Sequence, residues 1–337
     1  MKKILGFAVA VAAMTTSAMA AKNMENPLYM PYGGELYSKT SFGVMYKKTD
    51  DTLSQILRNT DGNYEFPIWR PMQELGFGIT DRWMVHGVAG YTHDADAGRK
   101  GFHLGRLGTT YRVIKTSDDF VWDLYGDFHL GGIEKMRGAL KPSEADPSKF
   151  VFHYKNYSNG RWGAHVGTKV GKTWSSRVTT SGFVEVLRTW GNHNNEIDVS
   201  ALGMGTLGVP DKMSVDISST WEINAGANVF YQMTDAWSGG LGFRYNHHAE
   251  NGLEDIHTDI SSASAVVQAY LKNMLSEYKH MHDRFDEYIL NLTLAYQISD
   301  GFQVAAYFED TLDKGDRLSA NTTDIKVEAG LRLNVVF

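Results

Sequence analysis

The final stretch of the chain, VEAGLRLNVVF at residues 327–337, alternates between apolar and polar or small side chains. Leu331 and Leu333 fall on one side, whereas Arg332 and Asn334 fall on the other. A period of two is the repeat of a β-strand, because successive side chains of a strand point to opposite faces. This stretch alone does not decide whether the apolar side meets a protein core or lipid, so the rest of the chain has to be considered.

The same alternation recurs through the chain. In residues 288–298, Leu290 and Leu292 lie on one predicted face, and Asn291 and Thr293 lie on the other. The other clear examples are residues 119–130, 221–231 and 237–245. The sequence therefore predicts an all-β fold built from many strands, each with one apolar and one polar face.

Two kinds of polar connection separate these strands, and they alternate along the chain. An apolar residue followed by Ser or Thr and then Asp recurs in ITDRWMV, MTDAWSG and ISDGFQV, and Asp closes tight turns by bonding its own backbone. The five predicted tight turns are residues 79–83, 115–119, 174–177, 233–236 and 298–301. The six predicted long loops are residues 49–66, 94–101, 134–160, 191–216, 250–284 and 313–323. This alternation predicts a transmembrane antiparallel β-barrel of about twelve strands, with the tight turns and the C-terminus at one rim.

Composition agrees with a barrel whose outer face meets lipid. No long apolar stretch follows Met14, which excludes a helical membrane protein, whereas a transmembrane barrel shows only alternate apolar residues. The absence of cysteine excludes disulfides, thiol chemistry and a lipid anchor on cysteine. A formal net charge of −6 without a basic stripe argues against a nucleic-acid partner.

The first twenty residues have the features of a signal peptide. Lys2 and Lys3 precede an apolar run from Ile4 to Met14, and the small-residue ending Ala-Met-Ala reaches Ala20. We expect cleavage near Ala20. The alternative is an N-terminal anchor, but the run is shorter than the roughly 20 apolar residues that a membrane-spanning helix needs.

Aromatic residues gather where the predicted strands begin or end. Those near the short turns are Trp83, Trp122, Trp174, Trp237 and Phe302. Those near the long loops are Tyr46, Tyr91, Trp162, Trp190, Trp221 and Tyr245. Amphipathic rings prefer the level of the lipid headgroups, so two such belts favour a barrel in a membrane over the alternative, a soluble all-β protein with an aromatic core.

The signal peptide, the alternating strands and a last strand that ends in Phe337 resemble bacterial outer-membrane β-barrel proteins. The segment NPLYMPYGGELYSKTSFGVMYK also resembles the start of porin-like members of uncharacterised function. The resemblance implies that Phe337 is the assembly signal read by the barrel-assembly machinery, and that outer-membrane lipids and lipopolysaccharide surround the barrel. The expected organisation is a signal peptide at 1–20, a periplasmic N-terminal segment at 21–35 and the barrel at 36–337.

The inward faces of the strands carry charges of both signs, and these either form a packed network or line an aqueous passage. The residues predicted to line a pore are Arg106, Arg112, Asp123, Asp127, Glu222, Arg244, Glu328 and Arg332. Replacing Arg112 or Arg332 by Ala is expected to shift selectivity towards cations, whereas Arg58, in a predicted loop, has little effect. The inward glycines either leave room for solute or relieve strain in bent strands.

Catalysis and metal binding are not expected. Outer-membrane phospholipases resemble this architecture, but no histidine here is followed two positions later by the serine that their chemistry needs. His247, His248, His280, His282 and Asp283 flank the longest loop and were considered as metal ligands, but a solvated role is the simpler interpretation. No cofactor is expected.

The longest loop is predicted to hold one helix. Apolar residues recur at helical spacing between residues 262 and 280, with Ser262 or Ser264 as the N-cap. A lid, a plug and a partner site are its alternative roles. The leading functional interpretation is a porin-like channel for passive diffusion of small polar solutes; the alternatives are a structural or surface-interaction barrel with a filled lumen and, third, an outer-membrane enzyme.

Overall fold

The computed structural model describes residues 23–48, 67–94, 99–116, 119–130, 137–142, 150–154, 161–198, 200, 203–249, 253–256, 261–269, 284–314 and 325–337. The predicted signal peptide at 1–20 and the loop that contains Arg58 lie outside these residues. No helix in the described part of the chain has the length and apolar character that a membrane crossing requires.

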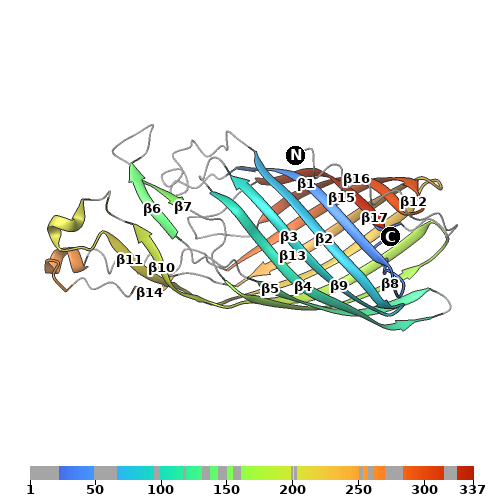
Figure 1. Ribbon diagram of the computed structural model, residues 1–337, viewed down its shortest axis with the longest axis horizontal. Coiled ribbons are helices and arrows are strands. Elements are labelled where there is room, and N and C mark those ends of the chain that lie inside the picture. The colour runs from blue at the N-terminus through green and yellow to red at the C-terminus, as the bar shows by residue number, and fades with distance from the viewer. Residues whose placement is uncertain are drawn as a thin grey trace.

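Within the described residues, twelve antiparallel strands form a closed barrel, as the sequence predicts (Figure 1). The barrel strands are β1 (Leu36–Lys48), β2 (Ile68–Thr80), β3 (Trp83–Asp94), β4 (Arg99–Lys115), β5 (Phe120–Leu130), β8 (Gly163–Thr173), β9 (Val178–Thr189), β12 (Thr220–Gln232), β13 (Trp237–His248), β15 (Phe285–Ser299), β16 (Phe302–Lys314) and β17 (Ile325–Val336). Each strand pairs with the next barrel strand along the chain, and β1 pairs with β17 to close the ring. Closure leaves no unpaired edge, which a strand structure in lipid requires.

The connections divide between the two rims by length. The five tight turns join β2 to β3, β4 to β5, β8 to β9, β12 to β13 and β15 to β16, and the antiparallel register brings them to one rim. Phe337 lies at the same rim, because its N–H donates to the Leu36 carbonyl over 2.8 Å. The prediction of turn positions is therefore confirmed. We call this rim the turn end and the opposite rim the loop end.

The two faces of the barrel wall follow the alternation in the sequence. In β17, Leu331 is 61% exposed on the outside, whereas Asn334 is fully buried inside. The large outward side chains Leu241 and Leu292 are likewise exposed, and their exposure marks the surface that meets lipid. Tryptophans exposed at the turn end are Trp83, Trp174 and Trp237, and those at the loop end are Trp69, Trp162, Trp190 and Trp221.

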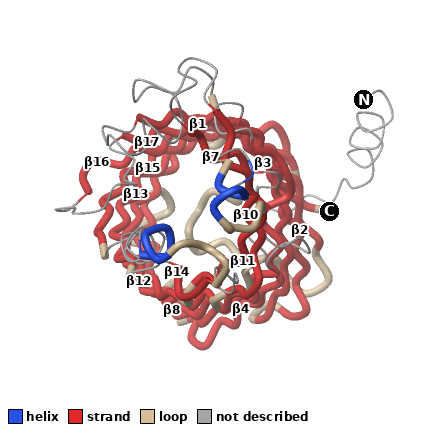
Figure 2. Tube along the Cα trace, turned by 90° about the vertical axis from the view of Figure 1, so that its left-hand side faces the viewer, coloured by secondary structure: helices blue, strands red, loops and turns tan. Residues whose placement is uncertain are grey.

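A second sheet extends from the loop end, and the sequence did not predict it. Its strands are β6 (Arg137–Pro142), β7 (Phe150–Tyr154), β10 (Asn192–Asp198), β11 (Lys212–Ile217) and β14 (Leu253–Ile256). All five come from stretches that were interpreted as polar loops. In Figure 1 this sheet lies beyond the loop end, and in Figure 2, which views the molecule from that end, part of it lies within the outline of the ring.

The helix predicted at residues 262–280 is described only in its first turn, residues 265–269. The N–H of Val267 donates to Ser264 Oγ over 3.4 Å, so Ser264 is the N-cap. The Gln268 N–H donates to the Ser264 carbonyl and begins the helical pattern. The rest of the predicted helix lies outside the described residues, as do His280, His282 and Asp283.

Candidate functional site: the barrel lumen

Residues 23–35 lie at the turn end of the barrel, and we call them the N-terminal segment; residues 23–31 contact the inner wall, whereas Tyr32, Gly33 and Gly34 are exposed at the rim. Two asparagines give it its turns: Asn23 Oδ1 accepts from the Glu25 N–H, and Asn26 Oδ1 accepts from the Leu28 N–H, at 3.1 and 2.9 Å. An Asn side chain that bonds its backbone two residues on stabilises a tight turn. Residues 21–35 are predicted to form a periplasmic segment, and the described part of them lies at the turn end.

Polar side chains on opposite sides of the barrel bind this segment. Asn23 donates to Gln232 on β12 and to Ser238 on β13, at 3.0 and 2.8 Å. Glu25 accepts from Arg332 and from Asn334 on β17, at 2.6 and 2.8 Å. β12 and β13 lie three or four strands from β17, but β8, from which Lys169 binds Pro27, lies six strands from β17 in the ring of twelve, so the segment bridges the lumen.

Two basic side chains hold the backbone of the same segment. Lys169 Nζ on β8 donates to the Pro27 carbonyl over 2.7 Å, and Arg112 on β4 donates to the Leu28 carbonyl over 2.9 Å. Arg112 also makes a two-point ion pair with Asp123 on β5, with N–O distances of 2.8 and 3.1 Å. The side chains of Arg112 and Asp123 are only 6% and 1% exposed, so this ion pair is sealed from solvent.

Glu25 is a buried carboxylate whose environment favours its charged form. Burial by itself raises the pKa of Glu25, but the positive charges of Arg332 and Lys39 and the hydrogen bonds from Asn334 and Arg332 outweigh burial. The net pKa of the Glu25 carboxyl therefore lies below its ordinary value. The N-terminal segment is consequently attached through an ionised group at neutral pH.

A series of histidines and carboxylates runs from strand to strand along the inner face of the barrel wall. His86 Nε2 on β3 lies 2.8 Å from Asp127 Oδ1, and His165 Nδ1 on β8 lies 3.1 Å from Asp127 Oδ2. The other ring nitrogen of His165 lies 3.1 Å from Glu185 on β9. Tyr125 donates to Glu185 over 2.7 Å and extends the series. Polar side chains from four strands, β3, β5, β8 and β9, are thus connected on the inner face.

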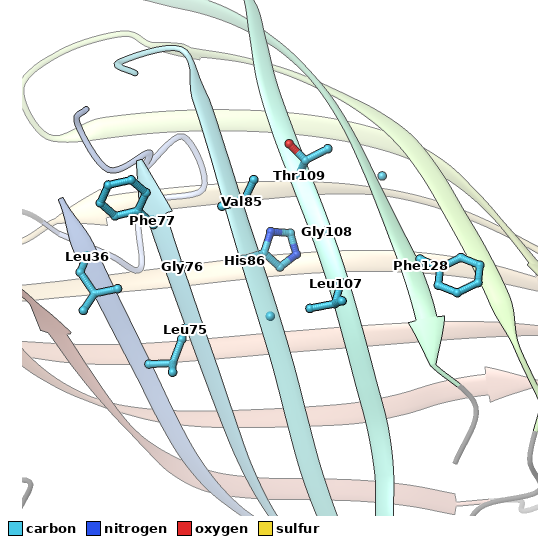
Figure 3. Close-up of a pocket in the computed structure, with 12 residues that line it drawn as sticks. Leu36, Leu75, Gly76, Phe77, Val85, His86, Leu107, Gly108, Thr109 and Phe128 are labelled. Carbon is cyan, nitrogen blue, oxygen red and sulfur yellow. The ribbon is translucent and has the colours of Figure 1, made fainter. Parts of the chain in front are cut away.

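The inward glycines give room to these side chains. A methyl group at Gly108 would overlap the Asp127 carboxylate and contact the His86 ring, and Figure 3 shows His86 beside Gly108. The ring of Tyr125 likewise lies over Gly167. The two predicted roles of the inward glycines were room for solute and relief of strain. At Gly108 and Gly167 the structure shows a different role, because these glycines accommodate rings and carboxylates that lie flat against the neighbouring strand.

Charges in the loop half of the lumen are more accessible. Arg244 on β13 lies 3.4 Å from Glu309 on β16, and their side chains are 37% and 22% exposed. Arg70 on β2 pairs with Glu328 on β17. These side chains point inward, so their exposure means that water reaches the inner wall at this level.

All eight residues predicted to line a pore lie on barrel strands. Among the ion pairs of the described residues, Arg112–Asp123 joins two of the eight. Arg332 binds Glu25, which the sequence analysis did not single out. Glu222 lies 3.2 Å from His248, and Arg106 stands opposite His129 in the register of β4 and β5.

His247 and His248, two of the candidate metal ligands at the loop end, contact different carboxylates. His247 Nδ1 lies 2.6 Å from Asp286, whereas His248 lies between Glu222 and Glu287. The sequence analysis missed the cluster of Asp127, His129 and His165, although its spacing contains a signal: Asp127 and His129 are two apart on one strand and so share a face.

The outer wall carries a shallow apolar depression of about 620 Å³ (Figure 3). Its rim consists mainly of outward side chains of β2 to β5, among them Leu75, Phe77, Leu107 and Phe128. Leu75 and Leu107 are 50% and 59% exposed. The depression therefore belongs to the surface that meets lipid and not to the polar interior.

The comparisons with known proteins agree with this fold. No family model and no curated protein matches the chain. Among solved structures, an outer-membrane channel from Pseudomonas putida F1 is similar with a TM-score of 0.58 at 11% identity, over 96% of this chain and all of the other. The NanC porin follows with a TM-score of 0.44 at 8% identity, covering 89% of this chain and 98% of the other. At this identity the likeness shows the fold, that of a bacterial outer-membrane β-barrel.

Proposed function

We propose that the chain is a channel in the outer membrane of a Gram-negative bacterium and serves the passive diffusion of small polar solutes, without catalysis. The observation that carries the proposal is the accessible ion pair of Arg244 and Glu309 inside a closed barrel. A lumen filled with side chains would bury such a pair, whereas an aqueous passage leaves it exposed. The similarity to a barrel described as an outer-membrane channel supports the same proposal.

The passage that we propose is wide at the loop end and narrow at the turn end. The N-terminal segment crosses the lumen at the turn end, where Arg112 and Asp123 are almost completely buried. Solutes then pass between this segment and the remaining wall. Outer-membrane lipids and lipopolysaccharide around the wall, and recognition of Phe337 by the barrel-assembly machinery, belong to the proposal.

A second candidate function has its own support. The N-terminal segment bridges the turn end, and the second sheet stands outside the barrel wall. These features favour a structural barrel whose lumen is plugged and whose outer sheet binds a partner. The two candidates differ in whether ions cross the barrel.

Conductance in a planar lipid bilayer separates the two. The mature chain, refolded in detergent and added to one chamber, should give discrete and reproducible current steps if it is a channel. Silence at all voltages would contradict the channel and favour the plugged barrel. Protein denatured by heat is the matched control, because it contains the same chain and the same detergent without the closed barrel.

A further inference from the structure

We propose that the inner wall of the barrel holds a binding site for one divalent transition-metal ion, formed by Asp127, His129 and His165. One ligand atom from each of these residues lies within 4.8 Å of the others. Asp127 and His129 extend from β5, and His165 extends from the paired strand β8, where it faces Asp127 in the register. The site therefore rests on two hydrogen-bonded strands of a closed barrel and not on a loop.

An unused donor atom points to a ligand at this place. Within the part of the chain that the structure describes, the buried Nε2 atom of His129 has no hydrogen-bond partner. A buried polar atom without a partner is costly, and a bound ion is one of the explanations for it. The ring of His129 lies edge-on to that of His165, with a centroid distance of 6.2 Å, so the unused nitrogen belongs to the same cluster.

The neighbours of the three residues are arranged as a supporting shell. His86 Nε2 lies against Asp127 Oδ1 at 2.8 Å, and His165 Nδ1 lies 3.1 Å from Oδ2, so the ion takes the place of the proton between Nδ1 and Oδ2. Glu185 lies 3.1 Å from His165 Nε2, which leaves Nδ1 for the ion. A histidine ligand normally donates its second ring N–H to a carboxylate, and this contact orients the ring. Glu185 is itself held by Tyr125 and Asn224, at 2.7 and 3.1 Å.

The donor set indicates the class of ion. Two imidazoles and one carboxylate suit Zn²⁺ and its neighbours better than Ca²⁺ or Mg²⁺, which prefer oxygen ligands. Tetrahedral zinc ligands at about 2.0–2.2 Å lie roughly 3.4 Å from one another, so ligand atoms within 4.8 Å need to close by up to about 1.4 Å. Binding replaces the proton on His165 Nδ1, which passes to solvent, and a water molecule completes the tetrahedron.

The other histidine and carboxylate groups in the described residues do not have this set. His247 meets a single carboxylate, Asp286, and His248 meets two carboxylates without a second imidazole. His247 therefore provides a matched control: it lies on a barrel strand, it pairs with a carboxylate, and the proposal gives it no role.

Zinc binding by the intact, refolded protein tests the proposal without any measurement of conductance. Isothermal titration of the mature chain with Zn²⁺ should give one site per chain, and Co²⁺ should develop the intense visible absorption of a tetrahedral complex. His129→Phe keeps a ring but removes both nitrogens, and it should weaken binding more than about tenfold. His247→Phe should leave the affinity unchanged.

The folding of each variant is checked by gel electrophoresis in detergent. In unheated samples the folded barrel migrates faster than the unfolded chain. If His129→Phe does not fold, His129→Gln takes its place, because its amide fits a polar wall. The proposal is overturned if the native chain takes up no Zn²⁺, if binding survives the loss of His129, or if His247→Phe weakens it equally. The channel proposal stands or falls separately, because none of these measurements involves ion flow.

Discussion

The two halves of the lumen use the same kinds of residue in opposite ways. At the turn end, Arg112 and Asp123 are 6% and 1% exposed, and Arg112 also binds the N-terminal segment. At the loop end, Arg244 and Glu309 form a longer contact and are 37% and 22% exposed. All four residues occupy inward positions of barrel strands, in which inward and outward residues alternate.

The difference shows that an inward charge is not in itself a pore-lining charge. What separates the two halves is the N-terminal segment, which covers the charged groups at the turn end and excludes water from them. Removing one partner of an ion pair that is shielded in this way leaves a buried charge unpaired, whereas an accessible pair is available to act on passing ions. Four experiments test this contrast.

The largest effect is expected on stability. Arg112→Ala leaves the buried Asp123 carboxylate without its main partner, and we expect it to lower the free energy of unfolding by about 3–5 kcal/mol. The value should lie near the lower end, because Lys169 Nζ remains 3.6 Å from Asp123. Arg244→Ala should cost only about 0–1 kcal/mol, as exposed pairs do. Urea unfolding in lipid vesicles, followed by tryptophan fluorescence, measures both.

A double variant controls this experiment. Arg112→Met combined with Asp123→Leu removes both charges at similar volume and should recover most of the lost stability. Equal losses for Arg112→Ala and Arg244→Ala would contradict the contrast between the two halves.

The second effect is expected on conductance. Removing residues 23–31 deletes the bridge across the turn end but keeps the backbone bonds of Gly34 and Glu35 to Gly78. We expect the single-channel conductance to rise severalfold, because the narrowest part of the passage is then open. Glu196→Gln, in the second sheet outside the barrel, is the control and should leave conductance unchanged. An unchanged conductance in the deletion variant would show that the segment does not narrow the passage.

The third effect is smaller and concerns selectivity. Arg244→Ala removes an accessible positive charge, so the permeability ratio should shift towards cations by about two- to threefold, because a unit charge about 7 Å away in salt-screened water acts oppositely on anions and cations. The double variant of Arg112 and Asp123 should shift it little, because its charges cancel and are shielded. Reversal potentials under a salt gradient measure both, and equal shifts would place the turn-end charges in the conduction path.

The smallest effect is expected with pH. The pKa of Glu25 is lower in the folded protein than in the unfolded chain, so its ionised form stabilises the docked segment above the ordinary carboxyl pKa of about 4.3. This contribution is lost as the pH falls through the lowered pKa. Conductance should therefore be constant from neutral pH to about pH 4.3 and rise only in stronger acid. Glu25→Gln should remove this step, and a rise that persists in the variant would assign it to another group.

The wall of the barrel was predictable from the sequence, because a period of two is a local property. Each inward or outward assignment depends only on neighbours two residues away, and the outward Leu241 and the inward Asn334 both follow it. The tight turns were predictable for the same reason, since Asp bonds its own backbone within the turn.

The contents of the lumen were not predictable in this way. Glu25 and Arg332 are 307 positions apart, and no periodic pattern connects them. The turns at Asn23 and Asn26 depend on asparagine side chains that accept from the backbone N–H two residues on, and asparagine is a local signal for a turn. This signal does not place the segment inside the barrel.

The second sheet escaped prediction for another reason. Its strands are short, from four residues in β14 to seven in β10, and β10, with the sequence NHNNEID, is almost entirely polar. The pairing of β10 with β6 is parallel and joins two different connections between barrel strands, so no hairpin turn in the sequence indicates it. Short polar strands that depend on distant partners look like loops when each is considered alone.

The pairing of β1 with β17 has a consequence for how the molecule assembles. The seam joins Tyr37 to Val336, so the ring cannot close until almost the entire chain has been delivered to the membrane. The N-terminal segment continues directly into β1 and binds β12, β13 and β17 from inside. Its contacts with β17 can form only once this last strand is in place. The order of synthesis and the order of assembly are thereby opposed: the first described residues reach their final contacts only when the last ones arrive.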